Sequence, residues 1–240
     1  RMSEKPYTCV FFDWDLTLVR VLGDISPEER LTALFQKEGM PYTLREVQTA
    51  IRRYRADLQS GHLKRTSSQQ TQRDITRYYQ DVLARLSHTN QGWDWATYLY
   101  NAYALLPQVP YDETMPVLRA LQAKGLKLGI VSNHSRLIRP FVEEMLKDFV
   151  PPEMIVISQE IGVHKPAKTI FRAACVHAQE DPASCVFVGN HLFVDAIGAV
   201  EEGEFGLGIW LDRKENNQQL TRIPERMVRV TSLWDVLNYV

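Results

Sequence analysis

The sequence lacks the features that place a protein in a membrane, on a nucleic acid or in a disulfide framework. No apolar stretch approaches the ~20 residues that a membrane helix needs. The 28 basic and 29 acidic residues give a net charge of −1, with no block of one sign. Cys9, Cys175 and Cys185 lack C-x-x-C spacing and suit reduced, mostly buried thiols. With no signal-peptide segment at the N-terminus, we expect a cytoplasmic protein without membrane or nucleic-acid partners.

The chain also has no repeat and no low-complexity linker, but its pattern changes along its length. Its 240 residues can form one large domain or two small ones. Residues 20–108 are helical in pattern, with four predicted helices. The first two begin with the capping signals Ser26-Pro27 and Thr43-Leu44-Arg45-Glu46. No alternation of period two occurs there, so we expect no strands in this block.

Short apolar runs alternate with helical segments in the rest of the chain. The pattern predicts strands over 126–131, 154–157, 185–188, 206–211 and 228–231, and helices over 114–124, 136–148, 167–178 and 194–202. Strands that alternate with helices indicate an α/β fold with a mostly parallel sheet. Because one apolar run precedes the helical block, that block is predicted to be an insertion.

The earliest of these runs begins at Cys9 and stops at Asp13-Trp14-Asp15. A continuous apolar run suits a strand buried on both faces. Asp13 would then stand at the carboxyl end of the strand, where open α/β sheets bind ligands. Two carboxylates at this spacing can hold a hard cation, or serve as a covalent nucleophile and a general acid/base. The alternative is a strand that ends in solvated aspartates at a turn.

Four stretches together carry a resemblance to a known family. Asp13-Trp14-Asp15-Leu16-Thr17 resembles motif I of the haloacid dehalogenase superfamily, D-x-D-x-[TV]. Three more follow in that superfamily's order, each after an apolar run: Ser132-Asn133, Lys165-Pro166, and Gly189-Asn190 followed by Asp195. The resemblance implies a Rossmann-like α/β core over 1–19 and 109–240. It also implies an α-helical cap over 20–108, inserted after motif I.

The resemblance further implies a phosphatase that hydrolyses a small phosphorylated metabolite through an aspartyl phosphate. Asp13 would be the nucleophile and Asp15 the general acid/base. Lys165 would neutralise the phosphoryl group, although from the sequence alone it could be a solvated loop lysine. Thr17, Ser132 and Asn133 would bind the phosphate. Ser132 and Asn133 also suit a cap for the following helix, a role compatible with the first.

A magnesium ion is the cofactor that the resemblance implies, held by Asp13, Asp15, Asn190 and Asp195. The family pattern is usually G-D-x(4)-D, and this sequence places Asn190 where the first acid is expected. An asparagine carbonyl can ligate a metal but contributes no charge. The expected consequence is weaker binding of Mg²⁺.

Two further groups of residues are ambiguous in the sequence. His134, His164 and His191 each adjoin a motif residue, and we favour polar positions at the rim of the site over a transition-metal site. Arg65, in a basic loop near Gly61, either selects the substrate from the cap or lies on an exposed loop.

Two other functions remain open at this point. A 2-haloacid dehalogenase would use the same nucleophile without a metal, but such relatives resemble D-x-Y at motif I, and this chain has Asp15. A catalytically weak, ligand-binding member of the family is favoured only by Asn190.

Overall fold

The computed structural model describes residues 7–23, 25–63, 76–88, 94–214 and 224–240. The chain divides into two compact units. The core unit comprises Arg1–Arg20 and Gln108–Val240, and the helical unit comprises Val21–Pro107. The chain therefore leaves the core unit shortly after the D-x-D pair and returns to it at Gln108.

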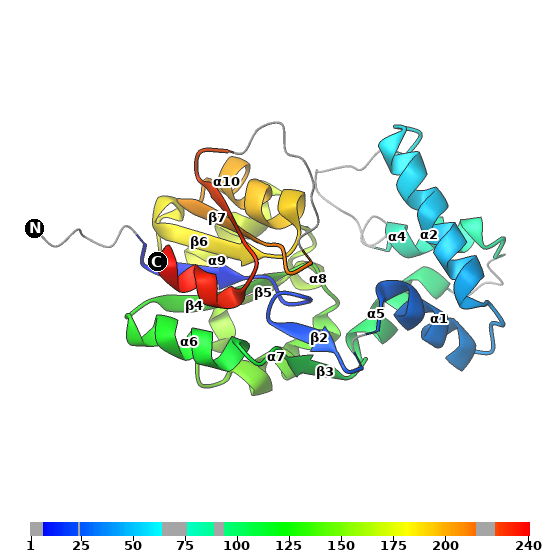
Figure 1. Ribbon diagram of the computed structural model, residues 1–240, viewed down its shortest axis with the longest axis horizontal. Coiled ribbons are helices and arrows are strands. Elements are labelled where there is room, and N and C mark those ends of the chain that lie inside the picture. The colour runs from blue at the N-terminus through cyan, green and yellow to red at the C-terminus, as the bar shows by residue number, and fades with distance from the viewer. Residues whose placement is uncertain (1–6, 24, 64–75, 89–93, 215–223) are drawn as a thin grey trace, which may run out of the picture. The chain divides into compact units, whose positions relative to one another are not determined.

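The core unit is built on a six-stranded parallel sheet (Figure 1). The order of the strands is β5-β4-β1-β6-β7-β8. Their bounds are β1 Cys9–Phe12, β4 Lys127–Ser132, β5 Ile155–Ile157, β6 Cys185–Gly189, β7 Leu207–Leu211 and β8 Met227–Val230. Every residue of β1 is fully buried, as expected for the central strand of such a sheet. The predicted α/β fold with a parallel sheet is confirmed.

Helices surround this sheet (Figure 1). They are α6 Thr114–Ala123, α7 Arg139–Leu146, α8 Ser158–Ile161, α9 Lys168–Ala178 and α10 Gly198–Glu201. Two predicted helices are interrupted in the structure. The segment 136–148 begins with a 3-10 turn at Arg136–Ile138, and the segment 194–202 is a π-helical turn, Leu192–Ile197, followed by α10. The short α8 was not predicted, because one helical turn is too short to show a period.

The described part of the helical unit contains α1 Pro27–Lys37, α2 Leu44–Gln59, α4 Arg77–Arg85 and α5 Trp95–Ala104. The predicted capping box at Thr43 is present, and the predicted helix start at Ser26 also forms a capping box. The side chain of Ser26 accepts a hydrogen bond from the Glu29 N–H, and Thr43 does the same for Glu46. Buried apolar side chains of all four helices form one cluster. The aromatic residues of α5 therefore serve mainly as core.

The expectation that residues 20–108 contain no strand is wrong at both ends of that block. β2, Val19–Val21, pairs with β3, Gln108–Pro110, in a two-stranded sheet. The Leu22 N–H also donates to the Pro107 carbonyl at 2.8 Å. Three-residue strands are too short to show alternation in a sequence, and this explains the error.

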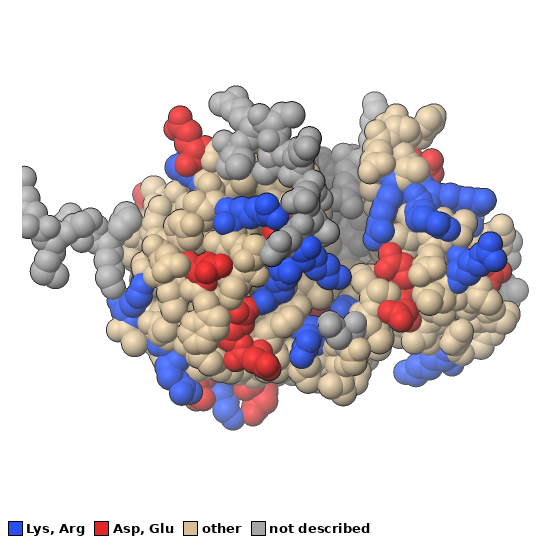
Figure 2. All heavy atoms as spheres, viewed as in Figure 1, with Lys and Arg blue, Asp and Glu red and all other residues tan. Residues whose placement is uncertain are grey.

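The structure can be compared with three observations from the sequence, which concern the cysteines, the lack of long apolar stretches and the balance of charges. Cys9, Cys175 and Cys185 are free and buried, as predicted. Among the described residues, no helix is both long and apolar enough to cross a membrane. On the face of the molecule in Figure 2, basic and acidic side chains of the core unit are interspersed. This agrees with the near-zero net charge.

Candidate active site

The candidate site lies where the strand order places it. β1 has β4 on one side and β6 on the other, and all three run parallel. Asp13 follows β1 directly, Ser132 ends β4, and Asn190 follows β6. The chain connections from the central strands lead to opposite sides of the sheet at this point. The carboxyl ends of the strands at such a point are the usual ligand site of an open α/β sheet. Residues more than 50 positions apart in sequence are thereby brought to one edge.

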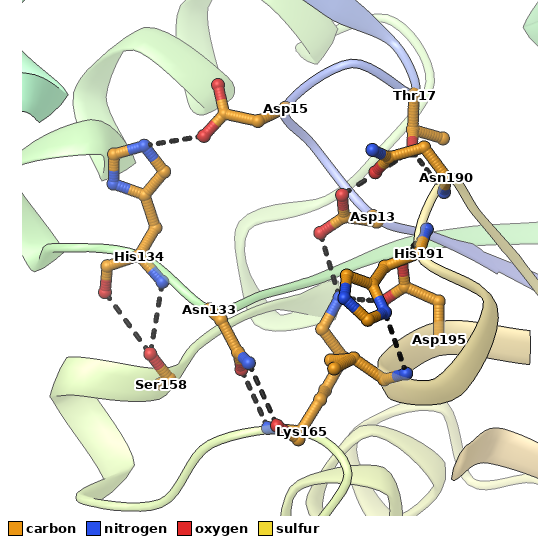
Figure 3. A network of polar contacts seen from close by, with 11 residues as sticks. Asp13, Asp15, Thr17, Asn133, His134, Ser158, Lys165, Asn190, His191 and Asp195 are labelled. Atoms are coloured by element: carbon orange, nitrogen blue, oxygen red, sulfur yellow. Dashed lines mark hydrogen bonds and ion pairs between the residues drawn. The ribbon is translucent and has the colours of Figure 1, made fainter. Parts of the chain in front are cut away.

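Lys165 lies between two carboxylates at this edge. Its Nζ is 2.8 Å from Asp13 Oδ1 and 2.7 Å from Asp195 Oδ1 (Figure 3). Lys165 is 3% exposed and Asp195 2%. A Cβ atom on Gly189 would lie 2.4 Å from the carboxyl carbon of Asp195, so this arrangement requires glycine there. The result is a buried cation held by two anions, with its position strongly constrained.

The charges in this cluster alter one another's ionisation. Burial raises the pKa of Asp13 to about 6, even though Lys165 acts in the opposite direction. Burial favours the neutral form of Lys165, but the carboxylates of Asp13 and Asp195 outweigh it and raise the lysine pKa. Lys165 is therefore charged near neutral pH. Removing it would leave Asp13 buried without its main stabilising charge.

The loop after β1 is held in a strained conformation. Leu16 has φ of 60°, a left-handed conformation that is uncommon for leucine. Arg213 supports this turn by donating to the carbonyls of Leu16, at 3.3 Å, and Thr17, at 2.8 Å. Arg213 also forms an ion pair with Glu113. The turn directs the buried hydroxyl of Thr17 back to Asp13 Oδ2, at 3.4 Å.

Three oxygen-bearing groups converge beside this loop: the Asp13 carboxylate, the Asp15 main-chain carbonyl and the Asn190 side-chain amide. When the Asn190 amide is turned so that its nitrogen faces the other two groups, that nitrogen lies 3.2 Å from Asp13 Oδ2 and 3.1 Å from the main-chain oxygen of Asp15. With its oxygen in that place, the amide completes a set of three oxygen donors. Such donors fit a hard cation such as Mg²⁺. Among the described residues, no group of three histidine, cysteine or acidic side chains could hold a metal.

The Asn133 side chain contacts the main chain of Lys165, and its expected contact with the phosphate stays a prediction. Its Oδ1 accepts a hydrogen bond from the Lys165 N–H at 2.7 Å, and its Nδ2 donates to the Lys165 carbonyl at 2.9 Å. Both polar ends of the amide are thus engaged with the main chain of one residue. Asn133 fixes the backbone from which the lysine extends. Ser132, at the end of β4, is 2% exposed.

Asp15 is oriented by Gln108, which the sequence did not identify, and by His134, which the sequence predicted only as a polar residue at the rim of the site. Its Oδ1 accepts a hydrogen bond from Gln108 Nε2 at 3.0 Å, and its Oδ2 lies 3.0 Å from His134 Nε2. In Figure 3 its carboxylate points toward His134 and away from Asp13. No sequence signal marks Gln108, which lies 93 positions after Asp15. Only the return of the chain at β3 brings the two together.

The other two histidines occupy different surroundings. His191 is exposed, and its Nδ1 accepts a hydrogen bond from the Val194 N–H at 3.2 Å. His164 is half-buried, and burial together with the nearby Lys165 lowers its pKa to about 4. These contacts give no support to a shared metal site for the three histidines. Arg65, the predicted substrate-reading residue, lies outside the described residues.

The strand order and the residues at the ends of the central strands define the class of protein. It is an α/β protein with a buried carboxylate–lysine site at the carboxyl edge of a parallel sheet. The chain belongs to the family of haloacid dehalogenase-like hydrolases, whose profile matches residues 7–203. The resemblance inferred from the four motifs is therefore confirmed.

Similar proteins agree with this assignment. A glyceraldehyde 3-phosphate phosphatase of Methanopyrus kandleri is 34% identical over 100 residues, which are 39% of this chain and 40% of the relative. Its counterpart in Methanothermobacter thermautotrophicus is 32% identical over 113 residues, 45% of this chain and 46% of the relative. The match thus spans less than half of each relative.

Solved structures match the fold over nearly the whole chain. YfnB of Bacillus subtilis, a putative HAD-hydrolase bound to magnesium, has a TM-score of 0.71 at 18% identity, with 98% of both chains covered. A 2-haloacid dehalogenase of Pseudomonas syringae has a TM-score of 0.61 at 20% identity, with 97% of both chains covered. At these identities the likeness concerns the fold alone.

Proposed function

We propose that the protein is a phosphatase that hydrolyses a small phosphomonoester through an aspartyl phosphate on Asp13. The observation that carries the proposal is the Lys165 ammonium bound directly to the Asp13 carboxylate at the carboxyl edge of the sheet. A cation in that position stabilises negative charge as a phosphoryl group reaches Asp13. The phosphatase names of the two archaeal relatives support the same activity.

In the first step, an oxygen of Asp13 forms a bond to phosphorus while the bond from phosphorus to the ester oxygen breaks. Asp15 donates a proton to that leaving oxygen. Lys165, Thr17 and Ser132 bind the oxygens of the transferring group. The attacking and leaving oxygens are roughly in line in such a transfer. A carboxylate that points away from Asp13, as that of Asp15 does, suits the far side of the phosphorus.

In the second step, water attacks the phosphorus of the aspartyl phosphate. Asp15, now ionised, accepts a proton from this water as general base. The bond between phosphorus and Asp13 breaks, which releases inorganic phosphate and restores the carboxylate. The same side chain thus serves both steps, and its protonation state after each step is the one that the next step requires.

Mg²⁺ is the cofactor that this site would take. Asp13, the Asp15 carbonyl and Asn190 would hold the ion. When bound, it would neutralise negative charge on the phosphoryl oxygens. Both oxygens of Asp195 already accept hydrogen bonds, from Lys165 at 2.7 Å and from the His191 N–H at 2.9 Å. We therefore propose that Asp195 serves the metal site chiefly by fixing Lys165.

Hydrolysis of a panel of phosphate esters, with and without Mg²⁺, tests the proposed activity. The panel would include glyceraldehyde 3-phosphate, because the archaeal relatives are named for it. A 2-haloacid such as 2-chloropropionate tests the dehalogenase alternative. We expect Mg²⁺-dependent release of phosphate and no release of halide. Release of halide alone would establish the alternative, and no turnover of either class would favour a ligand-binding protein.

The helical unit is proposed to act as the cap, with Arg65 in contact with the substrate. Arg65→Ala is then expected to change the preference among phosphate esters more than the rate with a small generic ester.

The general acid/base is the subject of one prediction. Asp15→Asn keeps the shape of the side chain but can neither donate nor accept the proton. We expect kcat with alkyl phosphates to fall ~10²–10⁴-fold, the usual loss for this kind of catalysis. Steady-state kinetics measure it, with circular dichroism as the control for folding. A rate within a few-fold of wild type would remove Asp15 from both steps.

Asn190 supports a prediction about the metal. Asn190→Asp adds a negative charge where three oxygens converge, and should lower the Mg²⁺ concentration for half-maximal activity by ~10-fold, as expected for one further charged ligand. Calorimetric titration with Mg²⁺ measures the same change without substrate. The added charge also repels the anionic substrate, so the maximal rate is expected to fall. Equal Mg²⁺ affinity in the two proteins would mean that Asn190 is not a ligand.

The raised pKa of Asp13 predicts an acid limb in the pH profile. The protonated carboxyl cannot attack phosphorus, so kcat/KM should fall as the pH drops through about 6 at low Mg²⁺. Because Mg²⁺ binds the ionised form and competes with the proton, higher Mg²⁺ should move this limb to lower pH. Profiles at several Mg²⁺ concentrations check the shift. A midpoint that is independent of the Mg²⁺ concentration would show that Mg²⁺ does not bind the Asp13 carboxylate.

A further inference from the structure

We infer that His134 and Gln108 are positioning residues that hold the Asp15 carboxylate toward the leaving group of the substrate. This inference rests on the proposed phosphatase function and adds two residues to it. Neither belongs to the four motifs, and neither touches the Asp13 carboxylate in the described structure. Each acts on one oxygen of Asp15 from a different element of the core unit.

Gln108 is itself held in place. Its Nε2 donates to Asp15 Oδ1 at 3.0 Å, while its Oε1 accepts a hydrogen bond from Trp14 Nε1 at 2.8 Å. Trp14 is fully buried beside the two aspartates. The tryptophan thereby fixes which end of the amide faces Asp15, because only the NH₂ end remains to meet the carboxylate. A glutamine with both ends engaged is a rigid donor rather than a loose surface contact.

His134 approaches the other oxygen from the loop after β4. Its side chain is 4% exposed, and its Nε2 lies 3.0 Å from Asp15 Oδ2. The Ser135 N–H donates to its Nδ1 at 2.9 Å. Since Nδ1 accepts, Nε2 is the ring nitrogen that carries a proton, and it faces Asp15. The His134 backbone is fixed in turn, because its N–H donates to Ser158 Oγ at 3.0 Å (Figure 3).

The Gln108 donor on Oδ1 and the His134 ring nitrogen 3.0 Å from Oδ2 restrict the rotation of the Asp15 side chain. Without them, the carboxylate of this partly exposed residue could turn into solvent or toward Lys165. A general acid gains much of its effect from placement, and an error of ~1 Å can cost ~10²-fold in rate. The arrangement should therefore matter most when the leaving oxygen needs a proton, which depends on the ester.

Alkyl and aryl phosphates separate this role from a merely structural one. An alkyl alkoxide is a poor leaving group and requires the proton, whereas 4-nitrophenolate leaves without it. The experiment measures kcat/KM for an alkyl phosphate and for 4-nitrophenyl phosphate with the full chain. This parameter reports the steps up to phosphoryl transfer, so the later role of Asp15 as base does not enter. The variants are His134→Phe, His134→Gln and Gln108→Leu, with His88→Phe in the helical unit as the matched control.

We expect kcat/KM with the alkyl ester to fall ~10–100-fold in His134→Phe and Gln108→Leu, within the range for general-acid catalysis. The aryl ester should change by less than ~3-fold, since it needs little acid assistance. His134→Gln keeps a donor nitrogen and should recover most of the loss, while His88→Phe should leave the ratio of the two esters at the wild-type value. The ratio does not depend on the folded fraction of each variant.

Equal losses with both esters, or no loss with either, would overturn the inference while leaving the phosphatase function intact. A wild-type protein that hydrolyses neither ester would instead overturn the proposed function, and the inference with it.

Discussion

Asp13→Asn is expected to abolish phosphatase activity while the fold persists. Asparagine has nearly the shape of aspartate but its amide does not attack phosphorus, so no aspartyl phosphate can form. We expect a loss on the order of 10⁵–10⁶-fold, comparable with removal of other covalent nucleophiles. Phosphate release under saturating substrate and Mg²⁺ measures the rate, and circular dichroism checks the fold.

Asp212→Asn is the matched control for this variant. Asp212 is also a buried aspartate just beyond a strand of the same sheet, 4% exposed, but its carboxylate pairs with Arg229 at 2.6 Å. Its substitution should alter stability and leave most of the activity. If Asp13→Asn retained a rate close to that of Asp212→Asn, Asp13 could not be the nucleophile.

Lys165→Met is expected to have the second-largest effect, on both activity and stability. Methionine fills a similar volume but leaves Asp13 and Asp195 buried without their shared cation. Removing one partner of a buried ion pair typically costs about 3–5 kcal/mol of folding free energy. The loss of electrostatic stabilisation should also lower kcat by at least ~10²–10³-fold. Urea unfolding and steady-state kinetics measure the two effects.

The pH dependence of Lys165→Met gives a sharper test of the cause. Burial already raises the pKa of Asp13 to about 6, and without Lys165 it should rise further. A carboxyl whose pKa is higher in the folded than in the unfolded state binds more protons when folded. Stability is then lost as the pH rises from about 4 through the folded-state pKa. The variant should therefore be more destabilised at pH 8 than at pH 5.

Lys127→Met provides the comparison for that measurement. Lys127 forms a partly exposed ion pair with Glu180 at 2.7 Å, at the opposite end of β4 from Ser132. We expect a small loss of stability there and no loss of activity. A Lys165→Met protein as stable at pH 8 as at pH 5, relative to wild type, would show that the lysine does not offset buried carboxylate charge.

Much of both units could be predicted because the signals are local. The run from Cys9 to Phe12 is uniformly apolar, and it forms a fully buried strand. Ser26 and Thr43 carry complete capping boxes, which form in the structure. The motif residues fall at strand ends, so a parallel sheet necessarily gathers them at one edge. This is why Asp13, Ser132 and Asn190 could be grouped from the sequence alone.

The remaining features depend on contacts between distant segments. Asn133 fixes the backbone of Lys165, 32 positions away, and Gln108 reaches Asp15 across 93 positions. Arg213 holds the turn at Leu16 and Thr17 across nearly 200 residues. None of these residues has a spacing or a periodicity that indicates its partner. The pairing of β2 with β3 was missed for a related reason, because each strand has only three residues.

Trapping the covalent aspartyl phosphate tests the central claim most directly. In Asp15→Asn, 4-nitrophenyl phosphate can still transfer its phosphoryl group, since its leaving group needs no proton, but hydrolysis of the intermediate lacks its base. We predict a burst of 4-nitrophenolate. After an acid quench, mass spectrometry should detect one added phosphoryl group on the peptide that contains Asp13. A burst without this adduct, or an adduct on a peptide that lacks Asp13, would contradict the account.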